Sequence, residues 1–323
     1  KLLAYSSMGQ LGYIVTGIAL MSHLGWVTAL YLTVNHFLFK GILFLAVAGV
    51  VLRTGERYMY KMGGLIKNMP FTFVATMIAI IAMSGVPPLT GFGGKWLLFN
   101  AIMEKGWYWL AALAFFSSAV AFLYMFRLLQ TVFLGQRKLA HAKLREAPAI
   151  LLVPQFLLIG VIMLFSAWPK LLLDVLSAAV TPWLGGSLVW DGLALQTDLG
   201  YWNAPMIMGI IAGVWMTPLV ILLLASLTLK IQKVEQFNIV YAAERPHRPE
   251  DTHFAYNFFA HYDRAIGFLV RPRATAFWNT ANEWTHTLAG GLRVFYNGNG
   301  QTYALLILMF LVGLYLVNGG LRQ

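Results

Sequence analysis

The sequence of 323 residues contains no cysteine and few charged side chains. Without cysteine it cannot build disulfides, thiolate zinc sites, iron–sulfur clusters or a cysteine nucleophile, and we expect it to hold no cofactor. Charged residues make up 11% of the chain, against about 25% in an ordinary soluble domain. Because 59% of the residues are hydrophobic, the composition excludes a soluble fold and predicts an all-α polytopic membrane protein.

Acidic residues are scarcer than basic ones, since 12 Asp and Glu stand against 23 Lys and Arg, giving a net charge of +11. An excess of positive charge is also typical of proteins that bind nucleic acid. Here the basic residues lie in the loops between apolar stretches, where the positive-inside rule of membrane topology accounts for them. We therefore expect no nucleic-acid partner.

Seven apolar stretches are candidate membrane spans, each of which needs roughly 20 residues. The third is too long for one straight span, and it contains Pro87, Pro88 and four glycines between residues 85 and 94. This composition predicts a broken helix, which membranes tolerate where neighbouring groups or water satisfy the freed backbone. The seven stretches are Leu2–Met21, Leu24–Leu52, Pro70–Glu104, Trp107–Gly135, Pro148–Val175, Pro205–Lys230 and Thr302–Val317.

Loop charges predict the orientation of these spans. Loops 53–69 and 136–147 each contain four Lys or Arg residues, and with seven alternating spans both loops fall on one side. The opposite loop, about 176–204, contains no Lys or Arg. By the positive-inside rule the basic side is cytoplasmic, so the C-terminus lies outside.

Segment 231–301 differs from the spans around it. A proline-containing polar stretch, 244–251, predicts irregular backbone. Two stretches that mix aromatic and charged residues follow, Phe254–Leu269 and Ala274–Phe295, and this mixture is typical of helices lying in the membrane interface. The loop charges place these helices on the cytoplasmic side, before the final span.

Two lysines lie within apolar stretches, Lys40 in the second span and Lys95 after the proline–glycine break. An ionisable group at membrane depth costs a few kcal/mol and by default marks a functional site. Lys40 is about 13 residues, or roughly 20 Å of helix, from Arg53, which is too far for its amine to reach the headgroups. His36 precedes Lys40 by one helical turn and shares its face. A desolvated lysine can exchange its proton near neutral pH, as histidine does unaided, so these residues predict a proton relay.

Simpler explanations cover the remaining polar residues. Carbonyls at the end of a half-helix would also hold Lys95, which is compatible with proton transfer. Arg127 is expected to extend toward the cytoplasmic interface, and Lys170 and Asp174 to form a surface pair. We expect no metal site, because the histidines lack ligand spacing. A helix end at the membrane surface explains a polar group in the first span: Lys1, Tyr5, Ser6, Ser7 and Gln10.

Four segments resemble one known family. Residues 1–13 read KLLAYSSMGQLGY, residues 35–44 read NHFLFKGILF, residues 61–65 read KMGGL and residues 85–95 read GVPPLTGFGGK. In order and spacing they resemble motifs of the antiporter-like subunits of respiratory complex I. The same family includes subunits of membrane-bound nickel–iron hydrogenases and of multisubunit cation/proton antiporters.

The resemblance implies roles for individual residues. Lys40 and Lys95 would be proton carriers on the central axis, His36 would lie between cavities, and Lys1 would match a further lysine of the family. A second histidine that some relatives have is replaced here by Leu32. Interfacial helices followed by a last span resemble the lateral helix of the subunit L-like member, and residues 262–270, YDRAIGFLV, resemble the lead into it.

The resemblance also divides the chain. We expect a C-terminal half-channel at 1–135, additional transmembrane helices at 136–230, an interfacial segment at 231–301 and a final transmembrane helix at 302–323. The family's first half-channel has no counterpart in the sequence, so we expect the chain to be the C-terminal half of a subunit that cannot pump by itself.

The function expected from these observations is proton translocation coupled to electron transfer elsewhere, as in an NADH:quinone oxidoreductase. The expected partners are other membrane subunits with a peripheral redox arm, and lipids. The expected location is the cytoplasmic membrane, rather than an organellar inner membrane. Alternatives are a cation/proton antiporter subunit, a membrane component of an energy-converting hydrogenase, or a scaffold whose lysines pair with acids of partner subunits.

Overall fold

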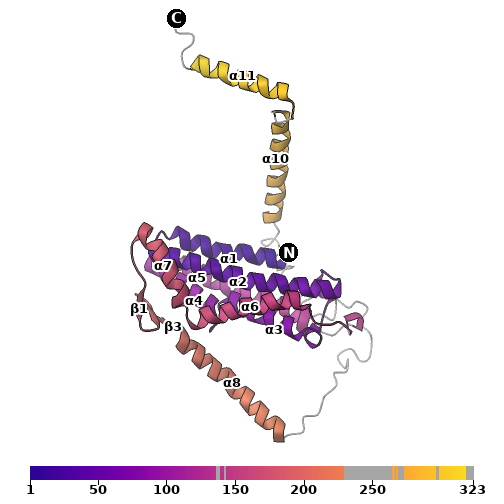
Figure 1. Ribbon diagram of the computed structural model, residues 1–323, viewed down its shortest axis with the longest axis vertical. Coiled ribbons are helices and arrows are strands. Elements are labelled where there is room, and N and C mark those ends of the chain that lie inside the picture. The colour runs from indigo at the N-terminus through magenta and orange to yellow at the C-terminus, as the bar shows by residue number, and fades with distance from the viewer. Residues whose placement is uncertain are drawn as a thin grey trace. The chain divides into compact units, whose positions relative to one another are not determined.

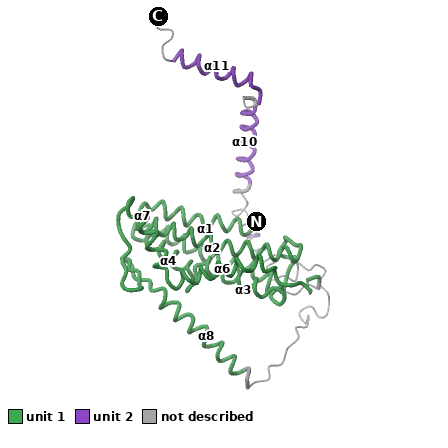
Figure 2. Tube along the Cα trace, viewed as in Figure 1, with its two compact units in different colours: residues 1–256 green, residues 257–323 purple. Residues whose placement is uncertain are grey.

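The computed structural model describes residues 1–135, 139–141, 143–228, 264–265, 267, 273–295 and 298–317. The chain divides into two units, 1–256 and 257–323, shown in different colours in Figure 2. The first unit contains the helices α1 (Leu2–Ala19), α2 (His23–Thr54), α3 (Pro70–Ser84), α4 (Thr90–Glu104), α5 (Tyr108–Leu129), α6 (Ala149–Ala167), α7 (Lys170–Leu184) and α8 (Ala204–Thr228) (Figure 1).

Shorter elements connect these helices. They are the 3-10 turns η1 (Met59–Lys61), η2 (Leu65–Lys67) and η4 (Leu139–His141), the π-helical turn η3 (Gln130–Leu134), and the strands β1 (Val189–Asp191), β2 (Ala194–Thr197) and β3 (Gly200–Asn203). In the second unit, the described residues include the helices α10 (Arg273–Phe295) and α11 (Gly300–Val317).

Helix α2 is the centre of the first unit, because α1, α3, α4, α6 and α7 all pack against it. Its 32 residues correspond to about 48 Å of helix. The Ser22 hydroxyl caps its start by accepting from the backbone N–H of Gly25 (3.2 Å). Gly55, with φ of 71°, ends the helix in the left-handed conformation that favours glycine.

Helices α1 and α2 form a tight antiparallel pair. A Cβ atom built on Gly17 of α1 would lie 2.9 Å from the carbonyl oxygen of Gly25 in α2. The backbones approach this closely because neither position has a side chain. Further along the pair, Lys40 of α2 contacts Leu3 and Ser6 of α1, so the two helices stay in contact over their length.

The predicted broken helix is confirmed. Helix α3 ends at Ser84, Gly85 takes a φ of 74°, and α4 begins at Thr90. Gly91 then approaches Ala82 so closely that a Cβ atom at this position would overlap the Ala82 carbonyl. Helices α3 and α4 therefore occupy different ends of the bundle in Figure 1, with the break between them.

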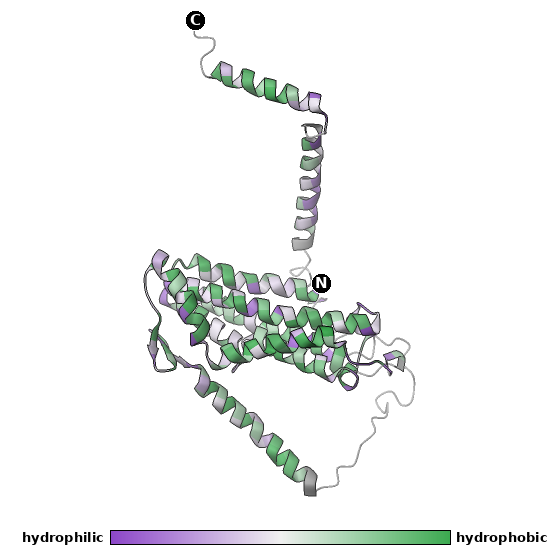
Figure 3. Cartoon of the chain, viewed as in Figure 1, coloured by the Kyte–Doolittle hydropathy of each residue, from purple (hydrophilic) through white to green (hydrophobic). Residues whose placement is uncertain are grey.

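The membrane character of the chain is confirmed, but the count of seven spans is not. Among the described residues, five helical segments are long and apolar enough to cross a membrane: His23–Thr54, Tyr108–Leu134, Ala149–Ala167, Ala204–Ala225 and Gly300–Val317. Helix α1 forms where the first span is predicted, yet it is not one of the five. Figure 3 shows apolar residues along α8 and α11, and the apolar segments of both helices are exposed.

The stretch Pro148–Val175, predicted as one span, consists of two helices. Helix α6 ends at Ala167, and α7 begins at Lys170 directly after Pro169. Proline has no backbone N–H and clashes with the preceding turn, which accounts for the break. The predicted surface pair then forms in the first turn of α7, with Lys170 Nζ 3.4 Å from Asp174 Oδ2.

The stretch 176–204, predicted as a loop, contains the end of α7 and a three-stranded antiparallel sheet. Its strand order is β1-β2-β3, with Trp190 opposite Leu195 and Leu195 opposite Trp202. Gly192 and Leu193 form the turn between β1 and β2, with Gly192 at a φ of 59°. Leu195 and Trp202 are buried against α2 and α4, so the sheet packs on these two helices.

The two basic loops lie together, as the loop charges predicted. Asn68 Nδ2 donates to the Leu144 carbonyl (2.8 Å), and Arg53 Nε donates to the Glu146 carbonyl (2.8 Å). The Glu146 side chain reaches the start of α3, where it accepts from Phe71 N–H (2.8 Å) and the Thr72 hydroxyl (2.6 Å). The cytoplasmic assignment of this side remains a prediction.

In the second unit, α10 confirms a helix over the predicted stretch Ala274–Phe295, and α11 confirms a helix over Thr302–Val317. Most of Phe254–Leu269 and all of 244–251 lie outside the described residues. The position of α10 in the membrane interface and the four-part division of the chain remain predictions.

Candidate functional site

Lys40 is buried in the interface between α1 and α2, with 5% of its surface exposed. Its Nζ donates to the Leu3 carbonyl (2.9 Å) and to the Ser6 hydroxyl. Both acceptors are neutral. A lysine ammonium has three N–H donors, so its charged form has one more donor than these two acceptors satisfy.

Lys95 is buried beside the helix break, with 3% of its surface exposed. Its Nζ donates to the Ser84 carbonyl (2.8 Å) at the end of α3 and to the Ser118 hydroxyl (2.7 Å) of α5. Ser118 in turn donates to the same Ser84 carbonyl (3.0 Å). The ammonium also lies over the ring of Tyr13, 5.2 Å from its centroid.

The glycines of the break position Lys95. Gly94 packs on Tyr31 and Leu32 of α2, where a Cβ atom would lie 2.7 Å from the nearest Leu32 carbon. On the neighbouring side, Gly93 leaves room for the Trp202 ring, which a Cβ atom would overlap. Small residues at both positions therefore let α4 approach α2 and the sheet closely enough to bury the lysine between α1, α3 and α5.

No carboxylate neutralises either lysine within the described residues, where the one ion pair is between Lys170 and Asp174. That pair is exposed, with about half of each side chain in solvent, and Lys170 also lies 4.4 Å from the ring centroid of Trp190. A buried ammonium without a counter-ion is costly. Each lysine can therefore take up or release a proton without breaking a salt bridge.

His36 lies one turn before Lys40, as predicted, and is half-buried. Its ring stacks edge-on against Phe39 at a centroid distance of 5.6 Å. Its Nε2 atom is buried and has no hydrogen-bond partner among the described residues. The structure thus places a titratable ring near Lys40 with one nitrogen available.

Lys1 is the site residue that the structure does not bring into this cluster. It is exposed at the start of α1, and its backbone carbonyl accepts from Tyr5 N–H. The guanidinium of Arg127 lies 5.2 Å from the ring centroid of Tyr60 in η1, at the end of the bundle with the basic loops, and its extension toward the cytoplasmic interface remains a prediction.

Two cavities are relevant to the site. The first, of about 280 Å³, lies between α1 and α5 and is lined in part by Tyr13, whose ring contacts Lys95. Its lining mixes small, aromatic and polar side chains: Tyr5, Gly9, Gln10, Tyr13, Phe116, Ser117, Val120, Ala121 and Tyr124. We call it the α1–α5 cavity.

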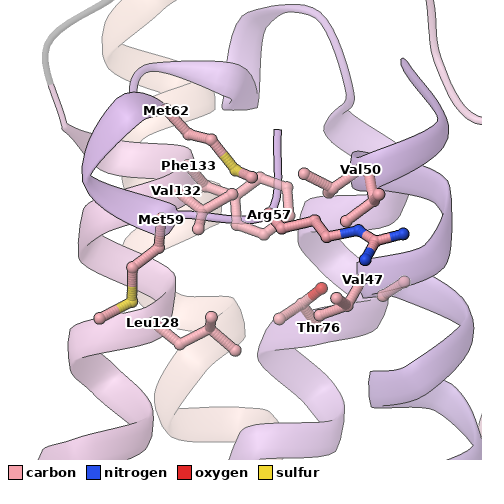
Figure 4. A pocket seen from close by; sticks show the side chains of 11 residues that line it. Val47, Val50, Arg57, Met59, Met62, Thr76, Leu128, Val132 and Phe133 are labelled. Carbon is pink, nitrogen blue, oxygen red and sulfur yellow. The ribbon is translucent and has the colours of Figure 1, made fainter. Parts of the chain in front are cut away.

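The second cavity, of about 70 Å³, lies beneath η1. Figure 4 shows the Arg57 side chain among Val47, Val50 and Thr76, with methionines and Phe133 completing the lining. Apart from Arg57 and Thr76 the lining is apolar, so this cavity offers few groups that could pass a proton.

Sequence reasoning missed the partners of the lysines. Ser118 and Tyr13 contact Lys95 from distant parts of the chain, and Ser6 contacts Lys40. One signal for Ser6, Gln10 and Tyr13 was available, because their i, i+4, i+7 spacing places three polar side chains on one helix face. All three are buried on α1.

The fold and the site define an integral membrane protein with ionisable groups inside a helical bundle. Residues 1–122 match the family described as NADH:quinone oxidoreductase/Mrp antiporter, transmembrane region, which confirms the resemblance to antiporter-like subunits. The NADH-quinone oxidoreductase subunit N of Desulforudis audaxviator is 35% identical over 196 residues, which is 57% of this chain and 39% of that protein.

Two further relatives cover more of the chain. One of the Na+/H+ antiporter subunits of Alkalihalophilus pseudofirmus is 29% identical over 66% of this chain and 30% of its own length. A chain of the membrane-bound sulfane sulfur reductase, an archaeal respiratory membrane complex, superposes with a TM-score of 0.73 at 28% identity. That superposition covers 96% of this chain and 51% of the other, so the chain spans about half the length of this relative.

Proposed function

We propose that this chain is a proton-translocating membrane subunit of a redox-driven complex of the NADH:quinone oxidoreductase type. The observation that supports it is the pair Lys40 and Lys95, each buried at 5% exposure or less and each held by neutral oxygen atoms. Protons would pass between Lys40, His36 and Lys95, while electron transfer takes place in partner subunits. The similarity to a respiratory complex over 96% of the chain favours such partners.

The proposed mechanism is electrostatic. A change of charge in the neighbouring protein changes the free energy of the ammonium form of Lys40, because interactions between charges are strong in a medium of low dielectric constant. Lys40 then gives up or receives a proton, and the altered charge acts on Lys95 in the same way. The Ser84 carbonyl and the Ser118 hydroxyl accept from Lys95 when it is charged.

The proposed partners are further membrane subunits, a peripheral redox arm and the surrounding lipids, and the proposed location is the cytoplasmic membrane, with the basic loops inside. The lateral helix proposed for the C-terminal part would contact neighbouring subunits. A hydrogenase arm in place of an NADH arm would leave the roles of the two lysines unchanged.

A cation/proton antiporter subunit is the second candidate, favoured by the likeness to a component of a Na+/H+ antiporter over 66% of the chain. The two candidates differ in their partners and in what drives transport. A redox-driven subunit purifies with flavin, iron–sulfur or nickel–iron proteins and pumps when substrate is oxidised. An antiporter subunit purifies with membrane subunits alone and moves protons when a sodium gradient is applied.

The test uses the full-length subunit in its native complex, reconstituted in vesicles with a pH-sensitive dye. We expect Lys95→Met to abolish redox-driven acidification while the complex still assembles. Lys170→Met, which removes an exposed lysine, is the control and should pump normally. Unchanged proton-to-electron stoichiometry in Lys95→Met would overturn the proposal, and transport driven by sodium but not by substrate would establish the antiporter.

A further inference from the structure

The two lysines are separated along α1. Lys40 contacts Ser6, and Lys95 lies over Tyr13. Ser6 and Tyr13 are seven residues apart, or about 10 Å at the helical rise. A proton cannot cross this distance in one step between hydrogen-bonded groups, whose heavy atoms lie about 2.6–3.2 Å apart.

Gln10 lies midway between the two contacts, on the same buried face of α1 as Ser6 and Tyr13. Its side chain is 4% exposed, and Nε2 has no hydrogen-bond partner among the described residues. Leaving a buried amide unpaired is energetically costly. A buried group of this kind indicates a partner that is not a side chain of the described bundle.

His36 occupies the same level on the facing helix. Helices α1 and α2 are antiparallel, and Ser6 of α1 contacts Lys40 of α2. Gln10 lies one helical turn after Ser6, and His36 lies one helical turn before Lys40, so Gln10 and His36 are at the same height along the pair. The buried Nε2 atom of His36 also lacks a partner among the described residues. Two unsatisfied groups therefore lie at the level between the lysines.

Gln10 also lines the α1–α5 cavity, together with Tyr13, Ser117 and Tyr124. Its volume of about 280 Å³ exceeds the roughly 30 Å³ that one water molecule occupies in the liquid. Buried water needs two to four polar partners, and the Gln10 amide and the hydroxyls of Tyr13, Ser117 and Tyr124 in the lining are of the right chemistry.

We propose that Gln10 is a positioning residue that holds water between Lys40 and Lys95. The amide donates to and accepts from the water but takes up no proton, so the water and His36 transfer the proton while Gln10 keeps the chain of hydrogen bonds aligned. Tyr13 marks the Lys95 end of this route, since its ring lies beneath the Lys95 ammonium while its hydroxyl donates to the Ala114 carbonyl (3.2 Å). This inference rests on the proposed function and adds the route between its two lysines.

The test compares Gln10→Leu, Gln10→Asn and Lys95→Met in the full-length subunit within its complex. Leucine has a similar volume but no hydrogen-bonding group, so we expect proton translocation to fall about 10- to 100-fold, the loss that misplacement of about 1 Å can cause. Asparagine retains the amide and should restore much of the rate, with one more water molecule taking the vacated space.

Thermal unfolding of the same complexes separates this role from a structural one. In this proposal the partner of the amide is water, which can leave the site when the side chain becomes apolar, so Gln10→Leu should leave the melting temperature nearly unchanged. Thr16→Val is the matched control, because Thr16 lies on the same helix and bonds its own backbone at Gly12 (2.8 Å). We expect it to pump normally.

The outcomes distinguish this inference from the proposed function. If Lys95→Met abolishes pumping and Gln10→Leu pumps normally, the lysines function in proton transfer but Gln10 does not. A loss of pumping in Gln10→Leu with a matching loss of stability would assign Gln10 to packing and overturn the inference. Normal pumping in Lys95→Met would overturn the proposed function and, with it, the route.

Discussion

Lys95 of α4 donates to the backbone carbonyl of Ser84, the last residue of α3, at 2.8 Å. The amine of one half-helix therefore satisfies an end carbonyl of the other, which the helix break leaves without an intrahelical partner. The same carbonyl lies at the negative end of the α3 dipole, which favours a nearby cation. The break thus provides a carbonyl acceptor and a favourable helix dipole, which offset part of the cost of burying a lysine that has no carboxylate partner among the described residues.

Ser118 connects α5 to this arrangement, because its hydroxyl both accepts from Lys95 and donates to Ser84. We predict that Ser118→Ala lowers the rate of proton translocation several-fold, since Lys95 loses one of its two acceptors. The cost in stability should be about 1 kcal/mol, the net value of a typical hydrogen bond. Dye-based pumping assays and thermal unfolding of the complex measure the two effects.

Ser166→Ala is the control for this change. Ser166 is buried, whereas Ser118 is half-buried, and the Ser166 hydroxyl bonds its own helix at Ile162 (2.7 Å). We expect a comparable shift in melting temperature and normal pumping. Equal loss of pumping in both variants would show that Ser118 affects transport only through stability.

Gly93 and Trp202 provide a test of how the sheet holds the broken helix. A Cβ atom at Gly93 would overlap the Trp202 ring, so Gly93→Ala should destabilise the protein by about 1–3 kcal/mol, as overpacking does. Trp202→Leu removes the ring, and the double variant should be more stable than the sum of the two single changes predicts. Thermal unfolding of all four proteins in detergent gives the coupling energy.

The neighbouring Gly91 is the contrast within the same segment. A Cβ atom there would overlap backbone, the carbonyl of Ala82, which no side-chain substitution can relieve. Gly91→Ala should therefore remain destabilised in the Trp202→Leu background. If Trp202→Leu restored the stability of Gly91→Ala, the contact of Gly91 with the Ala82 backbone would not be the cause of its destabilisation.

Glu146 joins the basic loops to the start of α3. Its carboxylate accepts from Phe71 N–H and Thr72, which caps the helix whose other end holds Lys95. We predict that Glu146→Ala costs about 0.5–2 kcal/mol, the range for loss of an N-cap. Glu146→Gln keeps an acceptor oxygen and should cost less. Glu56→Ala changes a neighbouring loop glutamate and should have little effect on melting temperature.

The sequence predicts those features that are encoded locally. Apolar stretches, the Pro87-Pro88 break and the position of Lys40 and Lys95 within them are all visible in short windows, and the structure contains them. Contacts between distant residues are not visible in this way. Ser118 reaches Lys95 from 23 residues away, and Ser6 reaches Lys40 from 34. Both contacts depend on how the helices pack.

Two features did leave local signals. Gly192, with its positive φ, is the first residue of the two-residue turn Gly192-Leu193 between β1 and β2, a position at which hairpin turns favour glycine. This turn lies within the stretch predicted as a loop. Pro169 likewise signals the end of a helix, which divides the stretch predicted as one span.

Lys40→Met distinguishes a proton carrier from a scaffold. Among the described residues Lys40 bonds two neutral acceptors and no carboxylate, so removing its charge also removes a desolvation cost, and the melting temperature should stay unchanged or rise. Proton translocation should fall about 100-fold or more, as for loss of a proton-transfer group.

A scaffold lysine that pairs with an acid of a partner protein predicts the opposite effects on stability and on transport, because Lys40→Met would leave that acid buried and unpaired. The complex would then dissociate or melt earlier, while the fraction that remains assembled would pump normally. Measuring the yield of intact complex and the proton-to-electron ratio in the same preparation separates the two results.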